Sequence, residues 1–266
     1  MSPLRAGCIA LAVEAGAAIL AVYAQDFAVE HKDDASPLTQ ADLAAHRILV
    51  AGLRTLAPDI PVLSEEAADI PWAERQAWTR HWLVDPLDGT REFVKKNGEF
   101  TVNIALVEGG RAVLGVVYAP VPGLLLHAEA GEGAWLRTDA GDVAVTTRRP
   151  AALPLRVAAS RSHLDPRTAA ALERMGETER IGLGSSLKFC RIAEGLVDVY
   201  PRFGPTSEWD TAAAQCVLEE AGGAVLRLDG QPLDYNRKDS LLNPDFIALG
   251  DPSLPWRDWL EASPHG

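Results

Sequence analysis

The segment W-L-V-D-P-L-D-G-T places two carboxylates, a glycine and a hydroxyl directly after an apolar run. Asp85 and Asp88 offer the hard oxygen ligands that Mg²⁺ prefers, and the Leu87 carbonyl between them can add a third. Gly89 lets the backbone approach an anion closely, so amides around Gly89 and Thr90 can cradle a phosphate. The segment predicts metal-assisted phosphate chemistry, although the same residue types also suit an ordinary Asp-rich turn.

Two distant acids stand where they could complete such a site. The run P-V-L-S-E-E is a short apolar strand that ends in Glu65, and α/β sheets usually bind ligands at the carboxyl ends of their strands. Asp210, in E-W-D-T-A-A-A, stands where a helix is expected to begin. Taken singly, Glu65 also reads as a solvated loop acid, and Asp210 as a first-turn acid favoured by the helix dipole.

Hydrophobic patterning predicts the elements that position these acids. In the first half we expect two helices and then several strands: helices 4–24 and 40–56, and strands at 62, 82–85, 101–107, 112–118, 124–127 and 143–146. After Pro150 we expect strands near 155, 181, 197 and 225, alternating with helices from 165, 185 and 209. This alternation indicates an α/β fold. We expect two lobes, 1–149 and 150–266.

Composition narrows the classes of protein that fit. The chain has 266 residues, is 47% hydrophobic and carries a net charge of −12. That charge disfavours binding to a nucleic acid polymer and suits a small anionic substrate held by metal ions. Cys8, Cys190 and Cys216 show no C-x-x-C spacing, so neither a disulfide framework nor a zinc site is expected.

The apolar start of the chain raises the question of a signal or membrane anchor. Glu14 interrupts the run, and only Arg5 precedes it. We therefore expect an ordinary N-terminal helix, with no integral membrane segment. The expected location is the cytoplasm, either free or peripherally on the cytoplasmic face of the inner membrane.

Together, S-E-E, D-P-L-D-G-T and W-D-T-A-A, in this order and followed by Gly222-Gly223, resemble the inositol monophosphatase superfamily of Mg²⁺-dependent, lithium-sensitive phosphatases. The stretches N-G-E-F-T-V-N-I-A, S-R-S-H, G-S-S-L-K-F-C and Y-P-R-F-G-P-T narrow the resemblance to its CysQ branch, the 3'(2'),5'-bisphosphate nucleotidases. These blocks span nearly the whole chain. The resemblance implies a layered α/β/α/β/α sandwich with the active site between the lobes.

The resemblance also implies roles for individual residues. Two or three Mg²⁺ ions would be held by Glu65, Asp85, the Leu87 carbonyl, Asp88 and Asp210. Catalysis would use a metal-activated water, with Glu65 at the site and Asp42 paired with Thr90 to orient the water. The stretch T-Q-A-D also reads as a helix start, with Thr39 as the N-cap and Asp42 in the first turn. Both readings stay open.

Substrate would be held by residues of both lobes: Asp88, Gly89, Thr90, Arg161, Ser162, Lys188, Arg202 and Asp210. The first lobe would carry most metal ligands, and the second would carry Asp210 and the cations and hydroxyls for a second phosphate or a nucleoside. Any one of these cations also reads as part of a solvated basic surface.

The expected reaction is removal of the 3'-phosphate from adenosine 3',5'-bisphosphate (PAP) to give AMP, and also conversion of PAPS to APS. The main rivals are an inositol monophosphatase or a fructose-1,6-bisphosphatase of the same superfamily. The HAD phosphatases use D-x-D-G-T with an Asp nucleophile, whereas the acids here are spaced D-x-x-D. A non-enzymatic Mg²⁺-binding protein is the alternative of another class. Both a monomer and a homodimer fit the sequence.

Overall fold

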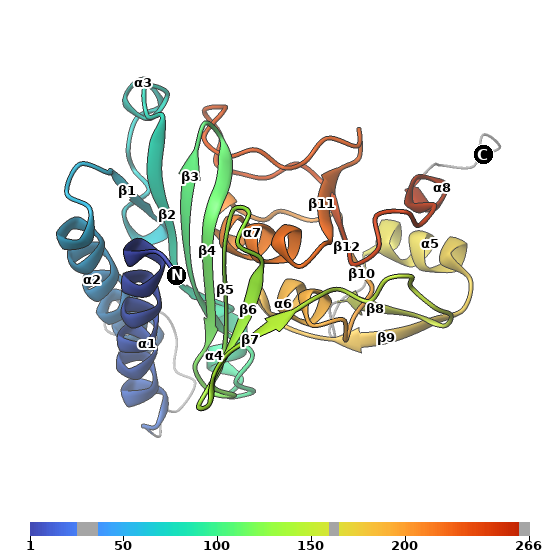
Figure 1. The fold of residues 1–266 in the computed structure, drawn as a ribbon, viewed down its shortest axis with the longest axis horizontal. Coiled ribbons are helices and arrows are strands. Elements are labelled where there is room, and N and C mark those ends of the chain that lie inside the picture. Colours follow the sequence, from blue (N-terminus) through green and yellow to red (C-terminus); the bar gives the residue numbers. More distant parts are fainter. Residues whose placement is uncertain (26–36, 160–164, 261–266) are drawn as a thin grey trace.

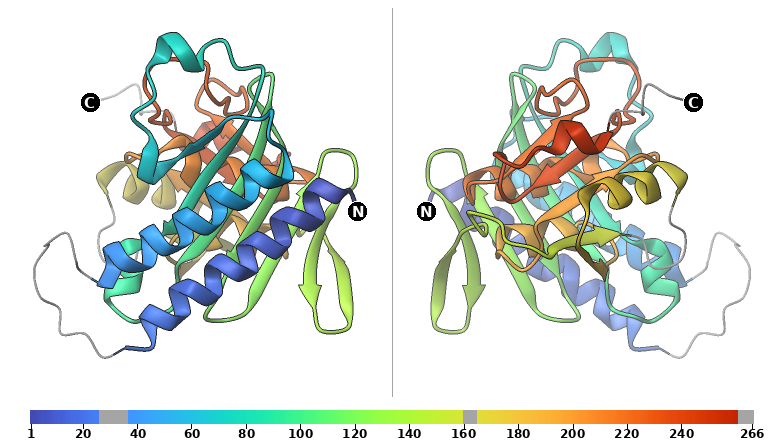
Figure 2. Two further views of the ribbon diagram at one scale, coloured as in Figure 1. Left: turned by 90° about the vertical axis from the view of Figure 1, so that its left-hand side faces the viewer. Right: turned by 90° about the vertical axis from the view of Figure 1, so that its right-hand side faces the viewer.

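The computed structural model describes residues 1–25, 37–159 and 165–260. Helices and sheets alternate in layers across the molecule (Figure 1). The first layer consists of α1 (Pro3–Tyr23) and α2 (Pro37–Leu56), which lie side by side over one face of the first sheet (Figure 2). Their buried faces carry Cys8, Ile19, Leu49 and Leu53, so the helices are held to the sheet by apolar packing.

The first sheet has seven strands in sequence order. They are β1 (Val62–Ser64), β2 (Arg80–Asp88), β3 (Thr101–Glu108), β4 (Arg111–Ala119), β5 (Leu124–Glu129), β6 (Ala134–Thr138) and β7 (Gly141–Val145). A short helix, α3 (Trp72–Arg75), lies between β1 and β2 in the chain. Strands β1 and β2 are parallel, and the other neighbours pair antiparallel. Gly109 and Gly110 form the turn between β3 and β4, both at positive φ.

A middle layer of helices separates the two sheets. It contains α6 (Leu187–Ala193) and α7 (Ala212–Glu220). Helix α7 lies so close to β4 that a Cβ on Gly115 would come within 2.2 Å of the Ala213 carbonyl oxygen. One apolar core continues from Leu83 of the first sheet through Val217 of α7 to Phe246 of the second sheet. The two halves of the chain therefore share a core.

The second sheet has five strands in the order β11-β12-β10-β8-β9. They are β8 (Leu155–Ala159), β9 (Thr178–Gly182), β10 (Val199–Arg202), β11 (Ala224–Arg227) and β12 (Phe246–Leu249). Helices α5 (Pro166–Met175) and α8 (Trp256–Leu260) form the outermost layer on its far side (Figures 1 and 2). The predicted α/β/α/β/α sandwich is confirmed, and the strands of the two sheets fall on either side of Pro150.

Several predicted elements need correction. The sequence pattern does not predict strands β6 and β12 or helix α8, which the structure contains. Helix α2 begins at Pro37 rather than at residue 40, so Thr39 lies inside the helix and is not its N-cap. Helix α7 begins at Ala212 rather than at residue 209, because a separate 3₁₀ turn, η2 (Glu208–Asp210), precedes it.

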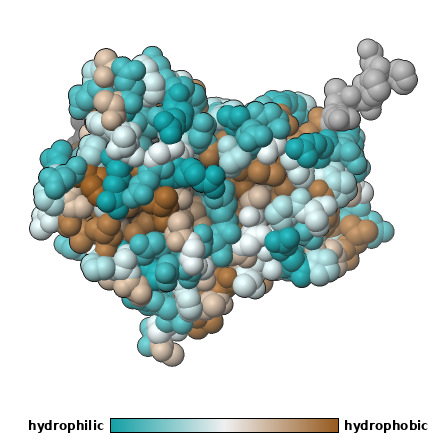
Figure 3. All heavy atoms as spheres, turned by 45° about the horizontal axis from the view of Figure 1, so that its top comes forward, coloured by the Kyte–Doolittle hydropathy of each residue, from teal (hydrophilic) through white to brown (hydrophobic). Residues whose placement is uncertain are grey.

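Helix α1 is the one element in the described part of the chain that is long and apolar enough to cross a membrane by length and composition. One face of it is fully buried against the protein's own sheet, through Cys8, Ala12, Ala15 and Ile19. Its outer face is partly apolar, with Val13 45% exposed. Figure 3 shows apolar residues gathered on the left of the molecule, the side on which Figure 1 places α1 and α2. The packing of α1 matches the ordinary helix that the sequence predicts.

Candidate active site

Two parallel strands deliver acids to the same end of the first sheet. Strand β1 pairs with β2 so that Ser64 lies opposite Val84. The next residue of each chain segment is therefore an acid at the same level, Glu65 on one and Asp85 on the other. Glu65 opens the 3₁₀ turn η1 (Glu65–Ala67), and Asp85 is 1% exposed. The structure thus places both acids where strand-end positioning predicts them.

An irregularity in β2 brings the second acid of D-P-L-D into the site. The pairing with β3 runs from Asp85 opposite Asn103 directly to Asp88 opposite Thr101. The stretch of β2 between these pairs is longer than the matching stretch of β3, which is a β-bulge. The bulge takes Leu87 out of the regular ladder, and its N–H donates to Asp85 Oδ1 at 3.0 Å. This local turn fixes the Asp85 carboxylate.

Asp210 reaches the same place from the second half of the chain. It ends η2, where its Oδ2 accepts a hydrogen bond from the Ser207 N–H at 2.9 Å in a capping box. Carboxylate oxygens of Asp85, Asp88 and Asp210 all lie within 4.8 Å of one another. Two acids of one motif and a third from the second half of the chain therefore meet at one place.

The raised pKa values of these clustered carboxyls indicate that a cation would stabilise their charged forms. Burial, together with the charge of Asp88, raises the pKa of Asp85 well above its ordinary range. Burial also raises the pKa of Asp88, against the opposing effect of the nearby Lys188 ammonium. The pKa of Asp210 is raised to about 7 by burial and by Asp88. Converging buried carboxylates with hard oxygen donors fit a divalent cation, which would relieve their repulsion.

Asp42 and Glu65 flank the cluster. Burial raises the pKa of Glu65, while a hydrogen bond with Asp85 lowers it in part. Burial and the neighbouring Glu66 raise the pKa of Asp42 to about 8. Thr90 is exposed, and the described residues show no hydrogen bond between Asp42 and Thr90. In this structure Asp42 therefore faces Glu66, and its pairing with Thr90 stays a prediction.

These pKa shifts predict how the metal-free protein responds to pH. Asp42 and Asp210 titrate near 8 and 7 when folded but have an ordinary value of 3.8. Between about pH 6.5 and 8 the folded state binds more protons than the unfolded state, so the free energy of unfolding falls as pH rises. The buried His81, whose pKa is lowered to about 4 from 6.5, acts in the opposite sense mainly below this window, because there the unfolded state binds a proton that the folded state does not.

We therefore expect the melting temperature in EDTA to fall from about pH 6.5 to about pH 8, and saturating Mg²⁺ to abolish the fall. Asp42→Asn should flatten the metal-free profile, because the variant lacks one of the two carboxyls that titrate there. Differential scanning fluorimetry across the window measures both effects. A metal-free melting temperature that rises through the window would contradict the assigned burial of these acids.

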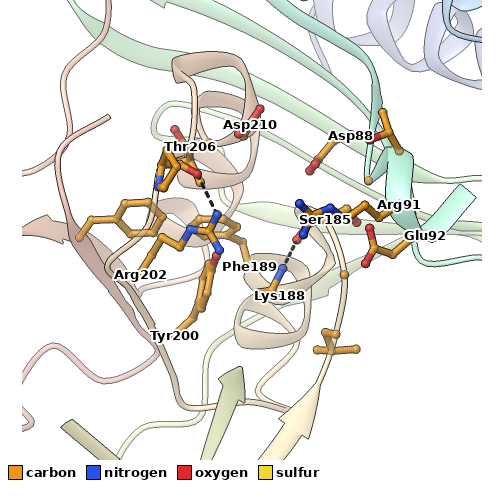
Figure 4. A pocket seen from close by; sticks show the side chains of 17 residues that line it. Asp88, Arg91, Glu92, Ser185, Lys188, Phe189, Tyr200, Arg202, Thr206 and Asp210 are labelled. Carbon is orange, nitrogen blue, oxygen red and sulfur yellow. Dashed lines mark hydrogen bonds between the residues drawn. The ribbon is translucent and has the colours of Figure 1, made fainter. Parts of the chain in front are cut away.

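A cavity of about 530 Å³ opens beside the acids (Figure 4). Six of the predicted substrate residues line it: Asp88, Gly89, Thr90, Lys188, Arg202 and Asp210. The acids Asp88 and Asp210 lie on one side of the cavity, and Lys188 and Arg202 lie across from them (Figure 4). The other two predicted substrate residues, Arg161 and Ser162, lie outside the described residues.

Gly89 adopts a conformation that few other residues tolerate. Its φ is +97°, where it precedes α4 (Thr90–Val94). A Cβ there would lie 3.2 Å from the Ser185 Cβ and 3.2 Å from the Phe100 Cα. The glycine thus allows β2 to turn sharply into α4 while the loop before α6 packs against the turn.

The two cations of the cavity are held by their surroundings. Lys188 is 8% exposed; its ammonium donates to the Ser185 carbonyl at 3.0 Å and lies 5.2 Å from the centre of the Tyr200 ring. Arg202 donates to the carbonyl oxygens of Gly204, at 3.2 Å, and Pro205, at 2.8 Å. Both positive groups are therefore fixed at the cavity wall before any ligand binds.

A segment that no sequence motif marks supports Asp210. Residues 235–243, which we call the strap, lie against the turn that carries Asp210. The buried Glu208 carboxylate accepts from the Asn236 N–H at 2.7 Å and from the Lys238 ammonium at 2.8 Å. Glu208 is 0% exposed, so these two donors supply the partners that a buried carboxylate requires.

The strap also joins the two halves of the chain. The Asn243 side-chain amide donates to the Ser207 carbonyl at 2.7 Å and to the Thr211 hydroxyl at 3.0 Å, on either side of Asp210. Arg75, from the first half, donates to Asn236 Oδ1 at 2.8 Å. The run of polar residues Y-N-R-K-D-S-L-L-N is the only signal in the sequence, and it resembles an ordinary loop.

Comparison with known proteins agrees with this geometry. Residues 1–250 match the model of the inositol monophosphatase family. The 3'(2'),5'-bisphosphate nucleotidase CysQ of Shigella flexneri is 53% identical over 239 residues, which cover 89% of this chain and 95% of that protein. The Escherichia coli K12 protein of the same name is 52% identical over the same length.

Solved structures show the same similarity. The crystal structure of CysQ from Bacteroides thetaiotaomicron, described as a bacterial member of the inositol monophosphatase family, matches with a TM-score of 0.84 and 42% identity over 92% of this chain and 96% of that chain. An inositol monophosphatase from Zymomonas mobilis matches with a TM-score of 0.80 and 25% identity, over 97% of this chain and 96% of that one. The chain belongs to the inositol monophosphatase family.

Proposed function

We propose that this chain is a metal-dependent 3'(2'),5'-bisphosphate nucleotidase that removes the 3'-phosphate of PAP to give AMP and phosphate, and that also accepts PAPS. One observation carries the proposal. Asp88 and Asp210, which converge with Asp85, line one side of a cavity whose other side presents Lys188 and Arg202 (Figure 4). A site with a metal-binding end and a separate cationic wall suits a substrate with two phosphates. The similarity to CysQ nucleotidases supports the same choice.

Both proposed lobes contribute to the metal end. The lobe 1–149 supplies Glu65, Asp85, the Leu87 carbonyl and Asp88, and the lobe 150–266 supplies Asp210. Bound there, a divalent cation would neutralise the charge of the phosphate and lower the pKa of a coordinated water. We take the cation to be Mg²⁺, as two or three ions, because hard carboxylate and carbonyl oxygens make up the donor set. The enzyme would act in the cytoplasm.

The protein's own residues orient the substrate. The turn at Gly89 and Thr90 lies beside Asp88 and lets backbone amides approach the phosphate that is removed. Lys188 and Arg202 would bind the second phosphate at the opposite wall. Tyr200 also lines the cavity and offers an aromatic surface beside Lys188. Fixed charges lose little side-chain entropy when the substrate binds, which favours selection of the bisphosphate.

Orientation of the attacking water is assigned to Thr90 with Asp42. Thr90→Ala should lower kcat by roughly 10²-fold or more with a much smaller change in KM, because a group that places the nucleophile acts mainly in the transition state. Asp42→Asn should behave similarly. If the two act as a unit, the double variant will be no worse than the more impaired single variant, whereas fully multiplicative losses would refute the pair. Steady-state kinetics of wild type, the two single variants and the double variant distinguish these outcomes.

A substrate panel tests the proposed function. The purified protein with Mg²⁺ is assayed for phosphate release from PAP, PAPS, inositol 1-phosphate and fructose 1,6-bisphosphate. We expect the highest kcat/KM on PAP. A preference for inositol 1-phosphate or fructose 1,6-bisphosphate would move the assignment to the rival phosphatases of the family. No phosphate release from any of them would favour a metal-binding protein without this activity.

A further inference from the structure

Ser186 makes a direct connection between two of the proposed metal ligands. It lies just before α6 and is 1% exposed. Its N–H donates to Asp88 Oδ2 at 2.7 Å. Its hydroxyl lies 2.9 Å from the same Oδ2 and 2.7 Å from the Asp210 carbonyl oxygen, and it can donate its single proton to either. Asn103 Nδ2 donates to the hydroxyl at 3.0 Å.

In this arrangement one carboxylate oxygen of Asp88 is hydrogen-bonded to other residues of the protein. Oδ2 receives the Ser186 donors at normal hydrogen-bond lengths, and the Thr101 hydroxyl lies 3.5 Å from it. A carboxylate oxygen that already accepts such bonds is a poor choice for a cation, so Oδ1 is the oxygen that can face a metal. Ser186 thereby fixes both the rotation of the carboxylate and the way it can bind.

The geometry points to Ser186 as a positioning residue for the metal site: it holds Asp88 as a one-oxygen ligand and sets the distance between Asp88 and the turn that carries Asp210. The inference rests on the proposed metal-dependent function. Groups that hydrogen-bond to metal ligands fix their orientation, and their loss typically weakens metal affinity about 10- to 100-fold. Neither the D-P-L-D-G-T nor the W-D-T-A-A motif contains this residue, because it comes from a third segment of the chain.

The loop around Ser186 has other anchors, so removal of the hydroxyl should not release it. The Gly184 N–H donates to Glu99 Oε2 at 2.9 Å. A Cβ on Gly184 would lie 2.8 Å from the Glu99 carbonyl oxygen, so the loop packs tightly on the first half of the chain. The Ser186 N–H bond to Asp88 also does not need the hydroxyl. Ser186→Ala therefore tests the hydroxyl rather than the loop.

The test measures metal binding directly. Metal-free wild type and Ser186→Ala are titrated with Mg²⁺ by calorimetry, and with Mn²⁺ while free Mn²⁺ is followed by electron paramagnetic resonance. We expect the Kd of Ser186→Ala to rise about 10- to 100-fold. Ser186→Thr, which keeps the hydroxyl, should remain within several-fold of wild type. The rise in melting temperature caused by a fixed Mg²⁺ concentration should shrink in Ser186→Ala, because that rise depends on Kd.

Ser253→Ala is the matched control. Its hydroxyl bonds to Asp251 Oδ1 at 2.6 Å, so the variant also removes a hydroxyl–carboxylate bond, but outside the residues that line the cavity. It should leave the Kd for Mg²⁺ unchanged. If Ser186→Ala lowers the melting temperature yet binds Mg²⁺ with the wild-type Kd, Ser186 only joins the two halves of the chain and the proposal is wrong.

Two further outcomes are separable. If Ser186→Ala does not fold, Ser186→Cys takes its place, because a thiol is only a weak hydrogen-bond donor; a several-fold weaker Kd supports the proposal, and a wild-type Kd overturns it. If wild type itself binds neither Mg²⁺ nor Mn²⁺, the proposed metal-dependent function fails and this inference fails with it. If instead wild type and Ser186→Ala bind the metal with the same Kd, only the inference about Ser186 fails.

Discussion

Replacing Asp88 with Asn is expected to abolish nearly all activity while leaving the fold intact. The variant removes one ligand charge at the point where phosphate and metal meet. Metal-assisted charge stabilisation is worth several kcal/mol, so a loss of about 4 kcal/mol would lower kcat/KM roughly a thousandfold. The melting temperature without metal should not fall, because burial already disfavours the charged form of Asp88 and its charge disfavours that of Asp85. The variant should therefore lose turnover while it keeps the melting temperature of wild type.

Asp229→Asn provides the control for this experiment. Asp229 is an exposed acid that pairs with Arg227 at the surface, and neither residue lines the active-site cavity. Activity of this variant should remain near that of wild type. The metal assignment is wrong if Asp88→Asn hydrolyses PAP at a near-normal rate with Mg²⁺ present.

Lys188 is expected to select the nucleotide substrate. Loss of one charge-assisted contact costs on the order of 1.5 to 3 kcal/mol, so Lys188→Met should lower kcat/KM for PAP by roughly 10- to 100-fold. The loss for inositol 1-phosphate should be much smaller, because that substrate has no second phosphate to meet the cation. Kinetics on both substrates give the ratio of the two losses.

Lys188→Arg is the matched variant, since it keeps a positive charge beside Tyr200 that still acts electrostatically on Asp88. It should recover part of the activity that Lys188→Met loses on PAP. Lys188 also lowers the pKa of Asp88, so its removal can affect every substrate through the metal site. Equal losses on PAP and inositol 1-phosphate would mean that Lys188 acts on Asp88 alone and does not bind a second phosphate.

Much of the fold follows from local pattern, and the exceptions have physical reasons. Helix α2 has a clear helical periodicity, α1 and the strands β2 to β5 have long apolar runs, and the structure contains all of them. Strand β6 has just one fully buried residue, Ala134, so its sequence lacks a core signature. Strand β12 (F-I-A-L) lies between β10 and β11, to which it pairs antiparallel from a distant part of the chain. Its four buried residues form a short apolar run, which periodicity alone does not distinguish from a segment of a buried helix.

The acids are easier to find from the sequence than the residues that support them. Glu65, Asp85 and Asp88 stand next to apolar strands or turn residues, so residue type and spacing alone mark them as candidate ligands. Ser186 and Asn236 carry no such mark, because a serine or asparagine in a polar segment has the same sequence appearance whether it is exposed or buried. Their burial and their partners result from contacts between distant segments.

The most direct test of the central claim is the identity of the product from PAP. The metal end of the cavity should receive the 3'-phosphate, and the wall with Lys188 and Arg202 should retain the 5'-phosphate. Complete turnover of PAP, followed by ³¹P NMR and chromatography of the nucleotide, should give 5'-AMP with one equivalent of phosphate. Adenosine 3'-phosphate as the product, or adenosine with two equivalents of phosphate, would contradict this account of the site.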